Sequence, residues 1–189
     1  MPLVIFLCLL LVVFLYLVSI YNNLVSLKHG VSRAWANIDV LLKQRHDELL
    51  KLVEVCRHYM QFEASTLDAV MQARAGVARA RETGNIAALG LAEGELRAGL
   101  SALYATVEAY PQLRSSDQFT HLAARITELE TSIADRREVY NDAVNANNVR
   151  IDQFPNIVIA RQCGFRAALL LQFAAPEKSD INLDKAFKS

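Results

Sequence analysis

Residues 31–59 read VSRAWANIDVLLKQRHDELLKLVEVCRHY, and the spacing of their apolar side chains indicates the fold class. Apolar positions recur every three, four or seven residues, which is the spacing along one face of an α-helix. No proline interrupts Leu3 to Tyr59, so one continuous helix of about 85 Å is expected at 1.5 Å per residue, with Gly30 as its weak point. The apolar positions are Val31, Trp35, Ile38, Leu42, Leu49, Leu52, Cys56 and Tyr59.

The chain before this helix has the composition of a membrane span. Residues 1–18, MPLVIFLCLLLVVFLYLV, carry no charge and no glycine. Residues 3–20 meet the roughly 20 apolar residues that a hydrocarbon core of about 30 Å requires. A cleaved secretory signal is the alternative, but no basic residue precedes the apolar run and Val18-Ser19-Ile20 is a poor cleavage site. The span residues are Leu3, Phe6, Leu10, Phe14, Leu17 and Ile20.

The charges around the span predict its orientation. Lys28, Arg33, Lys43 and Arg45 follow the span, and no basic side chain precedes it. Basic residues near a span favour the cytoplasmic side. We therefore expect a single-pass protein of the inner membrane, with its N-terminus outside and its body in the cytoplasm.

The composition bears on the classes of partner. Basic and acidic residues number 20 each, so no bulk attraction to nucleic acid is expected. Cys8, Cys56 and Cys163 are scattered, which does not suggest a disulfide framework and suits a reducing compartment. Residues 31–175 fall within the usual size of one domain.

The helical period continues after residue 59. Residues 66–82 form the next expected helix, with Ser65 and Asp68 as its N-terminal cap. Asn85 is expected to cap a further helix that carries apolar residues from 86 to 107 and closes at Tyr110-Pro111. A polar turn at residues 114–117 then precedes the longest apolar stripe.

The longest apolar stripe runs over residues 119–151, and Phe154-Pro155 ends it. Residues 157–175 are again apolar, but Arg161 and Arg166 argue against a second span, because each charge costs about 2.5 kcal/mol or more at the bilayer centre. This stretch either completes the bundle core, which we favour, or lies on the bilayer with both arginines at headgroup level.

These segments predict an all-α protein in which an N-terminal transmembrane helix runs into an antiparallel long-helix bundle. About four soluble helices with short connections suit this architecture. The expected divisions are a span at residues 1–20, a juxtamembrane segment at 21–30, a bundle at 31–175 and a mobile polar tail at 176–189.

The sequence offers no catalytic motif. His46-Asp47-Glu48 is the densest cluster of suitable residues, but consecutive helical positions point about 100° apart. His58 and Glu63 lack the spacing of a zinc-protease helix. We therefore expect no enzyme activity, metal, cofactor or small-molecule substrate. A pocket where groups around His46 and His58 converge within hydrogen-bond reach would favour an enzyme instead. The basic run of Arg74, Arg79 and Arg81 is expected to face solvent.

Several short motifs in order resemble the LemA family of bacterial membrane proteins. The resemblance implies an N-terminal anchor, an antiparallel helical bundle, a bacterial source and no established catalytic activity. Some LemA-like members belong to magnetosome membranes. Family members usually read like RRxDLIPNLV where this chain has QRHDELLKLV, so Leu50 and Lys51 replace a proline and an asparagine, which should straighten the helix. The matching motifs are YNNLV at 21–25, Ala34-Trp35, IDVLLKQRHDE at 38–48, Ala73-Arg74, EAYPQL at 108–113, Phe119, Leu122, Tyr140-Asn141, Asn147 and Phe154-Pro155.

The polar motif residues have two interpretations. They either form interhelical networks that fix the register of the bundle, or they mark a groove for a partner. Trp35 is expected to be buried against the helix that contains Phe119 and Tyr140. Aromatic and arginine side chains around Pro111, namely Tyr104, Tyr110, Arg114 and Phe119, are candidate partner contacts. The polar motif residues are Asp39, Arg45, Asp47, Tyr140, Asn141 and Asn147.

Together these features predict a non-enzymatic, membrane-anchored helical-bundle scaffold. It would self-associate through the first helix as a homo-oligomer at the bacterial inner membrane and serve membrane organisation or remodelling. The alternative is a cytoplasmic-side adaptor or regulator that binds another membrane or signalling protein, for example in envelope stress. Both hypotheses require the lipid bilayer.

Overall fold

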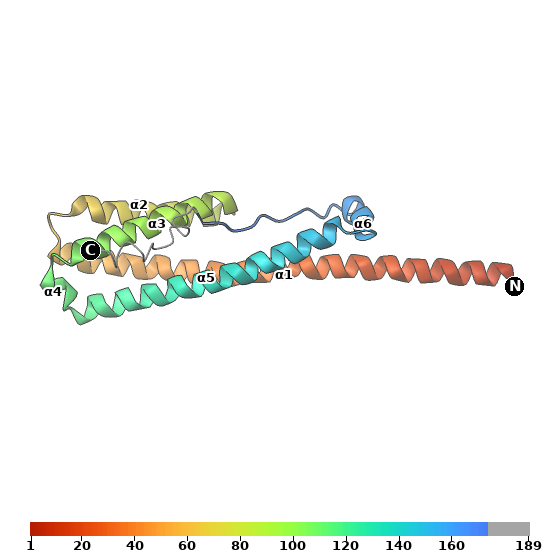
Figure 1. Cartoon of the computed structure of the whole chain (residues 1–189), viewed down its shortest axis with the longest axis horizontal. Coiled ribbons are helices and arrows are strands. Elements are labelled where there is room, and N and C mark those ends of the chain that lie inside the picture. The colour runs from red at the N-terminus through yellow and green to blue at the C-terminus, as the bar shows by residue number, and fades with distance from the viewer. Residues whose placement is uncertain (174–189) are drawn as a thin grey trace, which may run out of the picture. The chain divides into compact units, whose positions relative to one another are not determined.

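The fold described by the computed structural model covers residues 1–173, and its regular structure is entirely α-helical (Figure 1). The predicted all-α class is confirmed. Residues 174–189, which include the predicted tail at 176–189, lie outside the described residues. The helices are α1 (Pro2–Tyr59), α2 (Ala64–Glu82), α3 (Ile86–Val107), α4 (Pro111–Arg114), α5 (Asp117–Asp152) and α6 (Asn156–Gln162).

Helix α1 is continuous over 58 residues, as the absence of proline predicts. It passes through Gly30 without a break, and a methyl group built at Gly30 would meet nothing within 4 Å. It also passes through Leu50 and Lys51 without a break, so the first helix is straight where the sequence departs from the LemA-like pattern. The apolar N-terminal run and the amphipathic helix are therefore one element.

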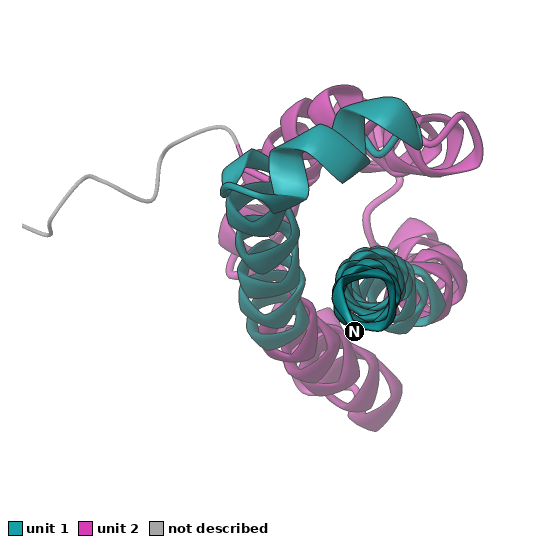
Figure 2. Ribbon diagram, turned by 90° about the vertical axis from the view of Figure 1, so that its right-hand side faces the viewer, with its two compact units in different colours: residues 1–40, 134–170 teal, residues 41–133, 171–189 magenta. Residues whose placement is uncertain are grey.

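The chain divides into two compact units, drawn in teal and magenta in Figure 2. Unit 1 contains residues 1–40 and 134–170, and unit 2 contains residues 41–133 and the chain from residue 171 onward. Both α1 and α5 contribute to each unit.

Unit 1 is held together by a small apolar cluster and by polar contacts. Ile20 and Leu24 on α1 pack with Ile151 on α5 and Ala160 on α6. Because α6 contributes to this cluster, the short helix is tied to α1 just where the apolar N-terminal run ends.

The segment after α6 is held by hydrogen bonds from α5. The Asn148 amide donates to the carbonyl of Ala168 and accepts from its backbone N–H, both at 2.9 Å. The Tyr140 hydroxyl donates to the carbonyl of Leu169, also at 2.9 Å. These bonds satisfy backbone groups that lie outside regular structure.

Unit 2 buries the apolar faces of α1, α2, α3 and α5 around one core. Asn85 caps α3 as predicted, since its side chain accepts a hydrogen bond from the Ala88 N–H at 3.0 Å. In the turn before α3, Gly84 has a φ of +64°, a backbone conformation that favours glycine. The largest fully buried side chains of this unit are Leu42, Leu49, Leu52, Met60, Leu89, Leu96, Leu103, Leu113, Ile126 and Leu129.

The predicted cap at Ser65 and Asp68 is wrong. Helix α2 begins at Ala64 with Glu63 at the N-cap, and no side chain caps it. The turn before Ser65 is formed by backbone hydrogen bonds instead. The Met60 N–H donates to the Cys56 carbonyl, and the Glu63 N–H donates to the Met60 carbonyl. Ser65 therefore lies inside the first helical turn.

The apolar stretch at the end of the described chain is only partly helical. Helix α6 ends at Gln162, and residues 165–173 form neither helix nor strand. Leu171 is buried in unit 2, and Phe165 packs on the apolar cluster of unit 1. Arg161 and Arg166 are exposed. Phe165 and Leu171 therefore pack on the chain's own helices, whereas Val158, Leu169 and Leu170 are exposed.

Candidate functional site

The N-terminal part of α1 presents an apolar surface that the rest of the described chain leaves uncovered. Large apolar side chains from Leu3 to Val18 are 39–71% exposed. Within residues 1–173, α1 is the one helix long and apolar enough to cross a membrane. Ile20 differs from the other predicted span residues, since it is only 6% exposed and packs in the apolar cluster of unit 1.

A cluster of polar side chains lies in the interior of unit 2. Arg45 on α1 and Glu93 on α3 form an ion pair, and each residue is 4% exposed. Burial raises the pKa of Glu130 on α5, while Arg45 and Arg97 oppose that rise and Glu93 adds to it. Three helices therefore contribute charge to one buried region of unit 2, which can fix their register.

The Tyr104 hydroxyl on α3 belongs to this polar cluster. It is buried, and no hydrogen-bond partner lies within reach among the described residues. Burial, followed by the charge of Glu130, raises its pKa to about 12, so the hydroxyl stays protonated.

Sequence reasoning selected Arg45 but missed Glu93. A signal was present, because Glu93 is four residues after Leu89 and three before Leu96 and so lies in phase with the apolar face of its helix. A charged residue on such a face requires a partner when it is buried. Arg45 supplies that partner.

His46 is held by Arg74 at the edge of unit 2. The Arg74 guanidinium donates from Nε to the His46 carbonyl at 2.9 Å and from Nη2 to His46 Nε2 at 2.5 Å. Because Nε2 accepts, the ring is neutral with its proton on Nδ1. Burial and then Arg74 lower the pKa of His46. Arg74 is half-buried, so the expectation that it faces solvent is wrong.

The His46-Asp47-Glu48 cluster separates as helical geometry predicts. Asp47 is exposed, which contradicts its assignment to a buried network, because its position falls on the outer face of α1. Glu48 accepts a hydrogen bond from Lys51 Nζ at 3.0 Å. Arg74 therefore interacts with both His46 and Asp47, whereas Glu48 is paired with Lys51.

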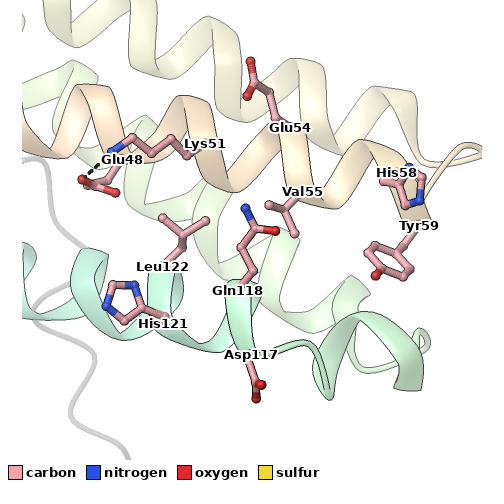
Figure 3. Close-up of a pocket in the computed structure, with 10 residues that line it drawn as sticks. All are labelled: Glu48, Lys51, Glu54, Val55, His58, Tyr59, Asp117, Gln118, His121 and Leu122. Carbon is pink, nitrogen blue, oxygen red and sulfur yellow. Dashed lines mark hydrogen bonds and ion pairs between the residues drawn. The ribbon is translucent and has the colours of Figure 1, made fainter.

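An open pocket of about 810 Å³ lies between α1 and α5 in unit 2 (Figure 3). It brings Glu48 and His58 to one cavity, together with His121 from α5. The one hydrogen bond drawn among its lining residues joins Lys51 to Glu48 (Figure 3). Among the described residues, no group of three or more His, Cys, Asp or Glu is placed to hold a metal ion. The pocket therefore has mixed charge, and among the described residues no hydrogen bond joins His58 or His121 to a carboxylate of its lining. Its lining residues are Glu48, Lys51, Glu54, Val55, His58, Tyr59, Asp117, Gln118, His121 and Leu122.

The predicted partner contacts around Pro111 are divided between the surface and the core. Phe119 is 7% exposed and the Tyr104 hydroxyl is buried, so the expectation that these two face a partner is wrong. Both lie in helical phase with core leucines. Tyr110 is half-buried, with its hydroxyl 3.5 Å from Glu63 Oε1, and Pro111 is exposed at the first position of α4.

The remaining predicted contacts lie in unit 1. Trp35 meets Tyr140 edge to face, with ring centroids 5.8 Å apart, so its contact with α5 is confirmed. Its expected burial is wrong, because Trp35 is half-buried. Asn147 is 4% exposed and donates to Asn148, whereas Phe154 is 84% exposed. Asp39 and Asn141 are half-buried.

Comparisons with known proteins agree with the motifs. Residues 34–184 match the LemA family. The chain is 26% identical over 175 residues to magnetosome protein MamQ 2 of Paramagnetospirillum magneticum, which covers 80% of this chain and 64% of the relative. It is 25% identical over 170 residues to magnetosome protein MamQ of Magnetospirillum gryphiswaldense, covering 77% of this chain and 62% of the relative. The chain thus spans less than two thirds of these curated relatives. Neither the family description nor these names denotes an enzyme.

Proposed function

Because this chain belongs to the LemA family, we propose that it is a non-enzymatic, membrane-anchored helical scaffold that self-associates at the bacterial inner membrane. The observation that carries the proposal is the continuity of α1, in which an exposed apolar run extends directly into the helices of the bundle. A continuous helix couples the anchor to the bundle without a flexible linker. The similarity to proteins named magnetosome proteins supports membrane organisation or remodelling as the process.

The surface for self-association is the exposed apolar run rather than the amphipathic part of α1. The apolar face of that part, including Ile38, Leu42 and Leu49, is already buried within the chain. By contrast, the described chain has no helix that covers the apolar side chains from Leu3 to Val18. Helices in lipid associate by van der Waals packing, and these side chains are the part of α1 that is free to pack against a second copy.

Crosslinking in native membranes tests self-association. A lysine-reactive reagent should give a covalent dimer or larger species, since Lys28 is exposed near the membrane. Exclusively monomeric protein over a range of expression levels would contradict the scaffold.

Oxidative crosslinking through Cys8 tests the proposed surface. Cys8 is exposed in the apolar run, whereas Cys56 is buried and its pKa is raised to about 11 by that burial, so it is unreactive. In a Cys163→Ala background, which removes the other exposed thiol, dimers should form and a further Cys8→Ser change should abolish them. If lysine crosslinks form but Cys8 crosslinks do not, the copies do not meet through the face of the run that carries Cys8.

An adaptor for another membrane or signalling protein is the second candidate, and the pocket between α1 and α5 favours it. Proximity labelling in intact cells would identify one dominant non-self partner that is lost in a His121→Ala variant, since His121 lines the pocket. Thr120→Ala is the matched control, because Thr120 is exposed beside His121 and does not line the pocket. Equal labelling of both variants would argue against the pocket as the docking surface.

A further inference from the structure

The turn between α5 and α6 lies beside the last turn of the apolar run of α1. One hollow in unit 1 is lined by Tyr16, Ser19 and Ile20 of α1 and by Phe154 and Pro155 of the turn, among others. Figure 1 shows α6 and the end of α5 next to α1, which continues beyond them toward the N-terminus. The turn is therefore level with residues that belong to the span.

The length of the span fixes the depth of this turn. Residues 3–20 cover about 27 Å at 1.5 Å per residue, close to the roughly 30 Å of a hydrocarbon core. Because the span is no longer than the hydrocarbon core requires, Tyr16 and Ser19 must stay near the boundary between acyl chains and headgroups. A turn packed beside them reaches the same level.

The α5–α6 turn exposes apolar side chains next to arginines, a combination that suits the boundary between acyl chains and headgroups. Phe154 is 84% exposed and Val158, four residues later, is 61% exposed. Arg150 and Arg161 are exposed on either side of them, and the Arg150 Nε donates to Asn23 Oδ1 at 2.9 Å. Apolar side chains flanked by arginines are typical of segments that lie in the membrane interface.

We propose that the α5–α6 turn is a second membrane contact, in which Phe154 and Val158 insert at the boundary between headgroups and acyl chains while Arg150 and Arg161 reach headgroup phosphates. The proposal rests on the proposed function, because it requires α1 to cross the bilayer. Exposed Asp152 offsets one arginine, so apolar insertion carries the contact and anionic lipid is not required. A second contact prevents unit 1 from rotating about the axis of α1.

Tryptophan fluorescence in vesicles tests this contact. The full chain is reconstituted into phosphatidylcholine whose acyl chains are brominated near the headgroup, in a Trp35→Phe background that removes the one native tryptophan. The Phe154→Trp variant should lose more than half of its emission relative to unbrominated vesicles. Val158→Trp provides a second position if the first variant fails to fold.

Two matched variants give the reference values. Phe14→Trp lies within the span and should also be quenched. Val139→Trp should keep its emission, because Val139 is 50% exposed and its neighbour Tyr140 contacts Trp35. Trp35 lies roughly 22 Å along α1 from Ile20, so Val139 is beyond the reach of the bilayer.

The outcomes separate the two proposals. If Phe14→Trp is quenched while Phe154→Trp and Val158→Trp behave like Val139→Trp, the membrane contact is overturned and the anchor stands. If Phe14→Trp is not quenched, the anchor itself fails. Emission from Phe154→Trp at short wavelength without quenching would mean that another protein or a second copy covers the turn, which also overturns a lipid contact.

Discussion

Arg45 on α1 and Glu93 on α3 form an ion pair inside unit 2, where each residue exposes only 4% of its surface. Removing two charges from water costs free energy that their attraction only partly offsets, so such a pair adds little net stability. Separating the partners is much more costly, because it leaves an unpaired buried charge. We interpret the pair as a constraint that sets the register of α3 against α1.

Glu93→Ala should lower the free energy of unfolding by about 3–5 kcal/mol, because Arg45 would remain buried without a partner. Urea unfolding of the full chain in mild detergent measures the change. Glu95→Ala, at an exposed position of the same helix, should change stability by less than about 0.5 kcal/mol. The double change Arg45→Met and Glu93→Leu should recover most of the loss. A small effect of Glu93→Ala alone would show that water reaches the pair.

Gly90→Ala should destabilise the protein by about 1–3 kcal/mol, because the Gln172 carbonyl oxygen occupies the space that the new methyl group needs. Gly30→Ala is the matched control in a helix interior. It has open space and should stabilise by up to about 1 kcal/mol. Urea unfolding compares the two variants. Equal effects would mean that residues 171–173 do not pack on α3 in solution.

Trp35→Ala should cost about 1–3 kcal/mol, less than a fully buried tryptophan, because the indole is half-buried. About 0.5–1.5 kcal/mol of this would come from the edge-to-face contact with Tyr140. A double-mutant cycle of Trp35→Ala with Tyr140→Ala measures that share. Strictly additive losses would show that the two rings do not interact.

Stability should fall as the pH falls below 6.5, partly through His46. Burial and Arg74 place the folded-state pKa of His46 below its ordinary value of 6.5. In the unfolded chain the imidazole takes up a proton near pH 6.5, whereas the folded state resists it until the lower pKa is reached. Unfolding measured from about pH 7.5 to about pH 5 should show a shallower loss in His46→Gln. Parallel curves for the two proteins would contradict this role.

Labelling of Cys163 should report the orientation of the membrane anchor. Cys163 is exposed after α6, and a Cys8→Ala background leaves it as the one exposed thiol of the described chain. If the bundle is cytoplasmic, an impermeant maleimide should label Cys163 only after the inner membrane is opened. Labelling in intact spheroplasts would place the bundle outside and direct the search for partners to the envelope.

The helices themselves were predictable because their signals are local. The spacing of Ile38, Leu42 and Leu49 along α1, the cap at Asn85 and the absence of proline before residue 59 all act within a few residues along the chain. The partners of individual polar residues were less accessible to prediction. Glu93 and Arg45 are 48 positions apart, and only the packing of α3 against α1 brings them together.

By itself, the sequence determined the all-α class, the apolar run that suits a membrane span and its fusion to an amphipathic helix. These depend on composition and on a period of 3.6 residues, both of which are properties of short segments. Only the tertiary structure decided that Glu93 is buried against Arg45 and that Phe154, which lines one hollow with Tyr16 at the end of the apolar run, stays exposed. Exposure is a property of the assembled surfaces, because a side chain is buried or free according to which distant element packs over it.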